Sequence, residues 1–83
     1  MPWKVVAKPH FLRDLKGIPE ADRRRIQAAI NRMVDSMSDA HIIKLSGDDW
    51  RLRVGDWRVF MYWDNSTGVI SLTGVKRRTS TTY

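Results

Sequence analysis

Three arginines lie close together in the sequence, Arg51 and Arg53 before a Gly-Asp dipeptide and Arg58 after it. A guanidinium group donates two parallel hydrogen bonds to phosphate oxygens, and it also stacks on nucleobases. These residue types at this spacing therefore favour the binding of a phosphate-bearing partner.

The Gly55-Asp56 dipeptide predicts how the arginines come together. Alternating apolar and polar residues precede it at 50–54 and follow it at 57–63, and a leading glycine suits a two-residue hairpin turn. This turn fixes a register in which Arg53 lies opposite Arg58. Like charges directly opposite each other destabilise a sheet unless an anion or a partner compensates them. We therefore expect a functional cluster, with edge protection or solubility as the alternative explanation.

The same register assigns the other side chains of the hairpin to its two faces. Phe60 and Tyr62 follow Arg58 at two-residue spacing, so their rings are expected on the arginine face, where nucleobases could stack on them. The opposite face is expected to belong to the core, and it carries Trp50, Leu52, Val54, Trp57, Val59 and Met61.

A second basic segment follows the last predicted strand. Lys76, Arg77 and Arg78 are consecutive, and Tyr83 is the last residue. A disordered basic tail is the usual interpretation of such a segment, and RNA contact is the alternative. The segment alone favours neither.

The rest of the sequence predicts the elements that must hold the hairpin. A strand at 3–7 and a short helix ending at Gly17 come first, and a second helix runs from about Pro19 to about Ser38. Residues 39–49 are expected to connect this helix to strands at 50–54, 57–63 and 69–75. The order βααβββ describes one α+β domain over residues 1–83, with two N-terminal helices packed on an antiparallel sheet.

The second predicted helix is amphipathic, with one apolar stripe that contains Ile26, Ile30 and Met33. Its run Arg23-Arg24-Arg25 falls largely outside the stripe. Such a charge run is more often a solvated face than a site, so we do not include it among the RNA-binding residues.

Composition narrows the class of partner and of chemistry. Fifteen Lys and Arg against nine Asp and Glu give a net charge of +6, which favours a polyanionic partner. The chain has no cysteine, so disulfides and thiolate metal ligands are excluded. It also has no apolar stretch long enough to span a bilayer and no signal peptide pattern. We therefore expect a cytoplasmic protein without a membrane partner.

The two histidines, His10 and His41, raise the alternative of a paired acid and base as in other ribonucleases. Nothing in their spacing brings them together, so an ordinary surface or capping role is favoured. Two histidines without cysteine also make a zinc site improbable, and we expect neither a metal nor a cofactor.

Taken together, these residues resemble the RelE/ParE toxin superfamily, and the resemblance covers nearly the whole chain. Arg77 followed by Tyr83 is similar to the catalytic arginine and tyrosine near the end of RelE-like nucleases, the branch that cleaves RNA. The other stretches that carry the resemblance are 45–47, 50–59 and 75–77, together with Phe11, Asp14, Leu15, Ile18 and Pro19.

The resemblance implies a fold, an activity and partners. The fold would be a helix pair on a curved antiparallel sheet whose concave face receives mRNA in the ribosomal A site. The activity would be that of a metal-independent endoribonuclease, in which a ribose 2′-hydroxyl attacks its adjacent phosphate. The partners would be the ribosome, mRNA and a cognate antitoxin protein.

The resemblance also implies roles for individual residues. The catalytic residues would be Arg51, Arg53, Arg58, Arg77 and Tyr83. Further RNA contacts would come from Lys76, Arg78, Phe60 and Tyr62. RelE has lysines where this chain has Arg51 and Arg53, and arginine is a poor proton acceptor, so the general base remains open.

Two other functions remain as alternatives. One is a toxin of the ParE type, which shares the fold but inhibits DNA gyrase without nuclease activity. The other is a basic module that binds RNA or DNA through the arginine face.

Overall fold

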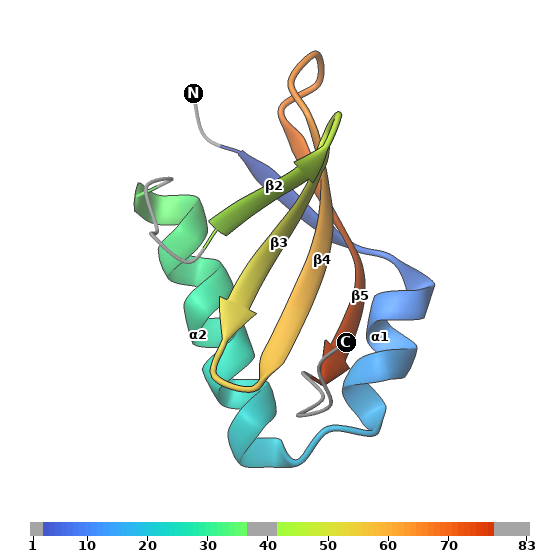
Figure 1. The fold of residues 1–83 in the computed structure, drawn as a ribbon, viewed down its shortest axis with the longest axis vertical. Helices are drawn as coiled ribbons and strands as arrows, with labels where there is room; N and C mark the ends of the chain where they lie inside the picture. Colours follow the sequence, from blue (N-terminus) through green and yellow to red (C-terminus); the bar gives the residue numbers. More distant parts are fainter. Residues whose placement is uncertain (1–2, 37–41, 78–83) are drawn as a thin grey trace.

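The computed structural model describes residues 3–36 and 42–77. Its strands form one five-stranded sheet in the order β1-β5-β4-β3-β2, and the N-terminal helices separate β1 from the other strands along the chain (Figure 1). The elements are β1 (Lys4–Ala7), α1 (Pro9–Lys16), α2 (Glu20–Ser36), β2 (Ile42–Ser46), β3 (Asp49–Val54), β4 (Trp57–Asp64) and β5 (Val69–Arg77). No helix in this described part of the chain is long and apolar enough to cross a membrane.

The predicted α+β class, with two N-terminal helices on one sheet, is confirmed, but two details of the sheet differ from the prediction. Residues 42–46, expected to be part of a connecting segment, form the edge strand β2. Most of β2 is exposed and a register shift interrupts its pairing with β3 between Lys44 and Ser46, so its sequence shows no clean alternation. The sheet is also mixed rather than antiparallel, because β1 pairs with β5 in parallel.

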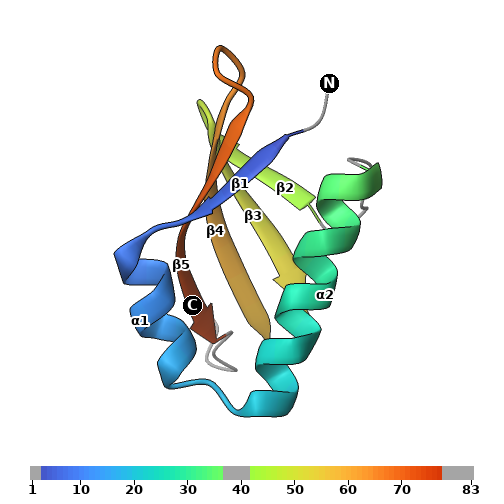
Figure 2. The same ribbon diagram turned by 180° about the vertical axis from the view of Figure 1, so that it is seen from behind.

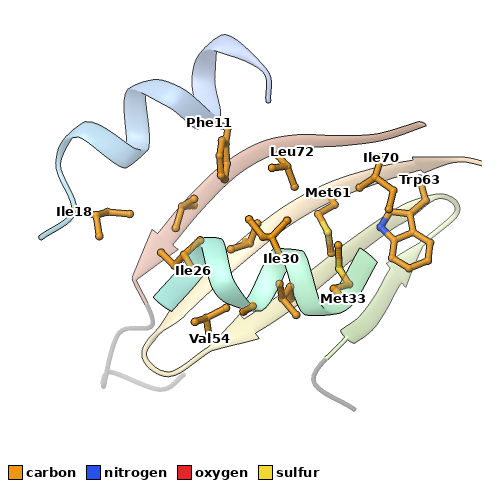
Figure 3. Close-up of a cluster of buried hydrophobic side chains, with 14 residues drawn as sticks. Phe11, Ile18, Ile26, Ile30, Met33, Val54, Met61, Trp63, Ile70 and Leu72 are labelled. Atoms are coloured by element: carbon orange, nitrogen blue, oxygen red, sulfur yellow. The ribbon is translucent and has the colours of Figure 1, made fainter. Parts of the chain in front are cut away.

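The core lies between the helices and one face of the sheet. Figure 2 shows the sheet from behind, on the side where α2 lies. The apolar stripe of α2 meets the predicted core face of the hairpin, and α1 contributes Phe11 (Figure 3). Fully buried members include Ile26, Met33, Leu52, Val59, Met61 and Ile70. Burying the large apolar side chains on this side leaves the opposite face of the sheet free for polar groups.

The hairpin between β3 and β4 has the predicted turn and register. Gly55 has φ +57°, a left-handed conformation that glycine adopts without steric cost. A Cβ at this position would also lie 2.7 Å from Nη2 of Arg25, so the end of this α2 side chain lies against the turn. Arg53 pairs with Arg58 in the ladder.

The helical arginine run is part of a solvated, ion-paired surface. Arg24 Nη2 lies 3.3 Å from Glu20 Oε1, and Arg25 Nη1 lies 3.6 Å from Asp22 Oδ1. Both pairs connect residues one turn apart on α2, as expected for an exposed helix face.

Helix α1 covers the part of β5 that β1 leaves without a strand partner. The ladder between β1 and β5 ends at the pair Ala7 and Leu72. Beyond it, the backbone N–H of Val75 donates a hydrogen bond of 2.9 Å to Oδ2 of Asp14. A helix and a side-chain acceptor therefore satisfy an edge that would otherwise offer unpaired backbone groups.

Candidate nucleic-acid interface

The face of the sheet opposite the buried core, which we call the open face, carries a row of three cations near the Gly55 turn. In the strand ladders Arg53 lies opposite Arg58, and Arg58 lies opposite Lys76. Adjacent strands are about 4.8 Å apart, so the three Cα atoms span about 10 Å. Within residues 3–36 and 42–77, no carboxylate lies within ion-pair distance of these three side chains. In this described part of the chain, the row therefore carries positive charge on the open face that no ion pair compensates.

A second row lies next to it, two residues further from the turn. Arg51 lies opposite Phe60, and Phe60 lies opposite Gly74. Arg51 and Phe60 are both half-buried, so a cationic residue and an aromatic residue are cross-strand neighbours on the open face. The two rows together offer cations for phosphate oxygens and a ring surface for a nucleobase.

A β-bulge in β5 decides which basic side chain joins the first row. The register of β4 and β5 shifts between Phe60 and Met61, and Thr73 is the extra residue. Its hydroxyl donates a hydrogen bond of 3.1 Å to the backbone oxygen of Phe60. Because one extra residue reverses the faces of all that follow, Lys76 points to the open face with Arg58.

Arg77 consequently lies on the other side of the sheet. It is opposite Trp57, and its guanidinium carbon lies 5.9 Å from the centre of a Trp57 ring. Around it is a cleft lined by Gly17, Pro19, Asp22, Arg25, Asp56, Trp57 and Arg77. The structure thus brings Arg51, Arg53 and Arg58 together on one face but does not place Arg77 with them. The other predicted C-terminal residues, Arg78 and Tyr83, lie outside the described residues.

Tyr62 occupies a third row, further along β4, between Asp49 and Ser71. Its hydroxyl donates a hydrogen bond of 3.4 Å to Oδ2 of Asp48. The negative charge of Asp48 raises the pKa of the Tyr62 phenol, and desolvation and the hydrogen bond act in the same direction. Tyr62 is therefore a neutral hydrogen-bonding and stacking group over a wide pH range.

One feature of this face was missed by the sequence reasoning. Gly74 has no side chain, and His10 and Asp14 from α1 fill the space beside it. A shallow hollow of about 220 Å³ lies there, lined by His10, Asp14, Phe60, Thr73, Gly74 and Lys76. The i, i+4 spacing of His10 and Asp14 was a visible signal, but nothing local connects it to Gly74, sixty residues later in the chain.

The described residues contain no group of three or more His, Asp or Glu side chains arranged to hold a metal ion.

Comparison with known proteins finds similar solved structures but no match among family models or curated sequences. A chain of the archaeal RelE–RelB complex from Pyrococcus horikoshii OT3 has a TM-score of 0.84 and 25% identity, and the match covers 98% of this chain and 100% of that one. The RelB–RelE complex from Methanococcus jannaschii matches with a TM-score of 0.71 and 26% identity, over 87% of this chain and 88% of that one.

The isolated E. coli RelE toxin shares the fold at a much lower sequence identity. It matches with a TM-score of 0.80 over 95% of this chain and 87% of that one, but the identity is 10%. The similarity to this structure concerns the fold.

Proposed function

Because this chain belongs to the RelE-like toxin superfamily, we propose that it is the toxin of a toxin–antitoxin pair and cleaves mRNA in the A site of the ribosome. The structural matches support a toxin function on their own. The nuclease activity, the ribosome and the mRNA substrate are the proposed part.

The observation that carries the proposal is the charge pattern of the open face. Four basic residues occupy two adjacent rows, and they are Arg51, Arg53, Arg58 and Lys76. Like charges opposite each other on neighbouring strands destabilise the folded protein. The negatively charged phosphodiester backbone of a bound RNA would compensate them. Phe60 lies within the same rows and offers a stacking surface for a base.

The chemistry that suits these groups is transesterification within RNA. The ribose 2′-oxygen would bond to the adjacent phosphorus while the bond from phosphorus to the 5′-oxygen breaks. Negative charge accumulates on the phosphate oxygens in the pentacoordinate transition state. Arg58, flanked by Arg53 and Lys76, is positioned to offset that charge, because fixed cations need little reorganisation as the charge develops.

Arg77 and Tyr83 complete the proposed catalytic set by resemblance to RelE-like nucleases. For Arg77 to act on a phosphate at the open face, its guanidinium would move from the Trp57 ring around the end of β5. There it would stabilise the leaving 5′-oxygen. Arg78 remains a proposed RNA contact.

A cognate antitoxin protein is the proposed regulatory partner. The matched archaeal structures are complexes of RelE with RelB, and the match to the Pyrococcus complex covers nearly this entire chain. An antitoxin that neutralised the cations of the open face would block RNA from the same rows.

The experiment that tests the proposal is primer extension on a reporter mRNA in a purified translation system, with the same mRNA free of ribosomes as the control. We expect cuts only in the translated mRNA, and their loss in the variant Arg77→Ala. Intact mRNA under active translation would contradict the proposed nuclease activity. Inhibition of DNA gyrase would then be the next activity to assay.

A further inference from the structure

Helix α1 presents a His–Asp pair at the edge of the cationic rows. Nε2 of His10 lies 3.5 Å from Oδ2 of Asp14, and the His10 side chain is 61% exposed. Asp14 is only 23% exposed, and the backbone N–H of Val75 donates to the same Oδ2 at 2.9 Å. The carboxylate is thus fixed to β5, while the imidazole that it faces is open to solvent.

The pair lies on the same face as the cations. His10 shares a hollow with Phe60 and Lys76, and Lys76 is the cross-strand neighbour of Arg58. The approach depends on Gly74, because a Cβ there would lie 3.2 Å from Oδ2 of Asp14 and 3.3 Å from Cδ2 of His10. Three elements, α1, β4 and β5, therefore place the imidazole next to the first two rows.

The proposed reaction needs a proton acceptor that the arginine rows do not supply. Guanidinium and ammonium groups donate hydrogen bonds and accept none. Tyr62 is held in its neutral form by Asp48, and Asp64 lies beyond Tyr62 at the far end of β4. Among the described side chains that line the hollow beside Phe60, His10 is the one imidazole, the side-chain type most often used as a general base, and it is exposed.

We propose that His10 accepts the 2′-hydroxyl proton during RNA cleavage and that Asp14 is its positioning residue; this inference rests on the nuclease activity proposed above. Because Nε2 faces Asp14, Nδ1 is the ring nitrogen left to take the proton. The 2′-oxygen then bonds to phosphorus and the bond to the 5′-oxygen breaks. Water protonates the leaving 5′-oxygen, and the imidazolium returns its proton to solvent.

The charged groups that face His10 come from two elements. Asp14 on its own helix is the anion beside the imidazole, and Lys76 on β5 is the cation that lines the same hollow. β4 contributes the uncharged ring of Phe60. A general base has to be unprotonated to accept the 2′-hydroxyl proton, so the rate of cleavage should rise with pH, and replacing His10 should remove that rise.

The test compares single-turnover cleavage of mRNA on purified ribosomes across a pH series for the wild type, His10→Gln and His41→Gln. His10→Gln is expected to lower the rate by about 10²- to 10³-fold and to remove the rise with pH. His41→Gln, which changes the only other histidine, is expected to keep both. Wild-type rates and pH dependence in His10→Gln would overturn the inference while leaving the nuclease intact.

Two further measurements separate proton transfer from other effects. Asp14→Asn retains an oxygen acceptor for the Val75 N–H, so it should fold like the wild type yet cleave more slowly, although less so than His10→Gln. An mRNA with sulfur in place of the bridging 5′-oxygen has a leaving group that needs no proton. The His10→Gln defect should persist on this substrate, and its disappearance would overturn the assignment by showing that His10 acts on the leaving group.

The outcomes for the two proposals are distinct. Absence of cleavage by the wild-type protein would overturn the nuclease and the role of His10 together. Cleavage by the wild type with an unaffected His10→Gln variant would overturn the role of His10 alone. Thermal unfolding of each variant shows that a loss of rate is not a loss of fold.

Discussion

Arg53 and Arg58 are directly opposite each other across β3 and β4, and no carboxylate in the described part of the chain lies within ion-pair distance of either. A cross-strand pair of like charges destabilises a sheet. In this protein the pair is part of the proposed RNA surface. The two charges should therefore favour RNA binding while they destabilise the free protein.

Replacement of one member of this pair should therefore stabilise the free protein. For Arg53→Gln we expect the free energy of unfolding to rise by about 0.2–1 kcal/mol in urea denaturation, because the repulsion is removed. RNA cleavage should become slower and less sensitive to salt. The matched control is Arg24→Gln on α2, where an ion pair with Glu20 is lost instead and no gain is expected. A lower stability of Arg53→Gln would contradict this account of the cluster.

The hairpin turn can be tested with two glycines of similar backbone conformation. Gly55 and Gly47 have φ +57° and +53°, but only Gly55 has a side chain, that of Arg25, within reach of an added Cβ. Each Ala variant should lose about 1–2 kcal/mol for the left-handed conformation. Gly55→Ala should lose slightly more, because the end of the flexible Arg25 side chain has to move aside.

A double-mutant cycle isolates the contact of α2 with the turn. In an Arg25→Ala background the costs of Gly55→Ala and Gly47→Ala should become equal, because the crowding atom at 2.7 Å is gone. Urea denaturation of the six proteins measures both differences. An excess cost at position 55 that survives in the Arg25→Ala background would show that the crowding is not its cause.

The bond between Asp14 and Val75 should make a measurable contribution to stability. Asp14→Ala removes the acceptor of a backbone N–H at the edge of β5, and we expect a loss of about 1–3 kcal/mol in the free energy of unfolding. Hydrogen exchange at the Val75 amide should accelerate in the same variant. His10→Ala leaves the bond in place and serves as the control, so equal losses in the two variants would contradict the assignment.

The hairpin between β3 and β4 is the part of the site that the sequence predicted best. A leading glycine and uninterrupted alternation on both sides of the Gly55 turn determine the register, and the pairing of Arg53 with Arg58 is confirmed. Edge strand β2 could not be predicted in the same way, because its side chains are mostly exposed and a register shift interrupts it. The parallel pairing of β1 with β5 depends on contacts between distant parts of the chain.

The face on which each side chain lies at the C-terminal end of β5 could not be predicted from the alternation of residues. In an uninterrupted strand Arg77 would share the face of Arg58, but the bulge at Thr73 gives that place to Lys76. The sequence around Thr73 does not predict the bulge, because the Thr73 hydroxyl bonds to the Phe60 backbone of a neighbouring strand. The His10–Asp14 pair escaped prediction for a similar reason, because its position depends on Gly74.

The ionisation of Tyr62 provides a pH-dependent prediction. Asp48 raises the pKa of the phenol, so the neutral form is favoured in the folded protein. Its contribution to stability is therefore present below the unfolded value of about 10 and is lost as the pH rises through the folded value.

Absorbance of the phenolate measures this shift directly. The chain has two tyrosines, so the titration is made in a Tyr83→Phe background where only Tyr62 remains. Adding Asp48→Asn should move the ionisation of Tyr62 to lower pH, because the largest contribution to the shift is removed. An unchanged titration curve would show that Asp48 does not control the phenol.

The most direct test of the central claim is the single-turnover rate at which the protein cuts mRNA in the A site of purified ribosomes, measured for the wild type, Arg58→Ala and Arg24→Ala. If the open face is the catalytic surface, Arg58→Ala should be slower by about 10²- to 10³-fold, as for other groups that stabilise a charged transition state. Arg24→Ala, which removes an equal charge from α2, should cut at the wild-type rate. Equal rates for Arg58→Ala and the wild type, or no cutting by any of the three, would contradict the assignment.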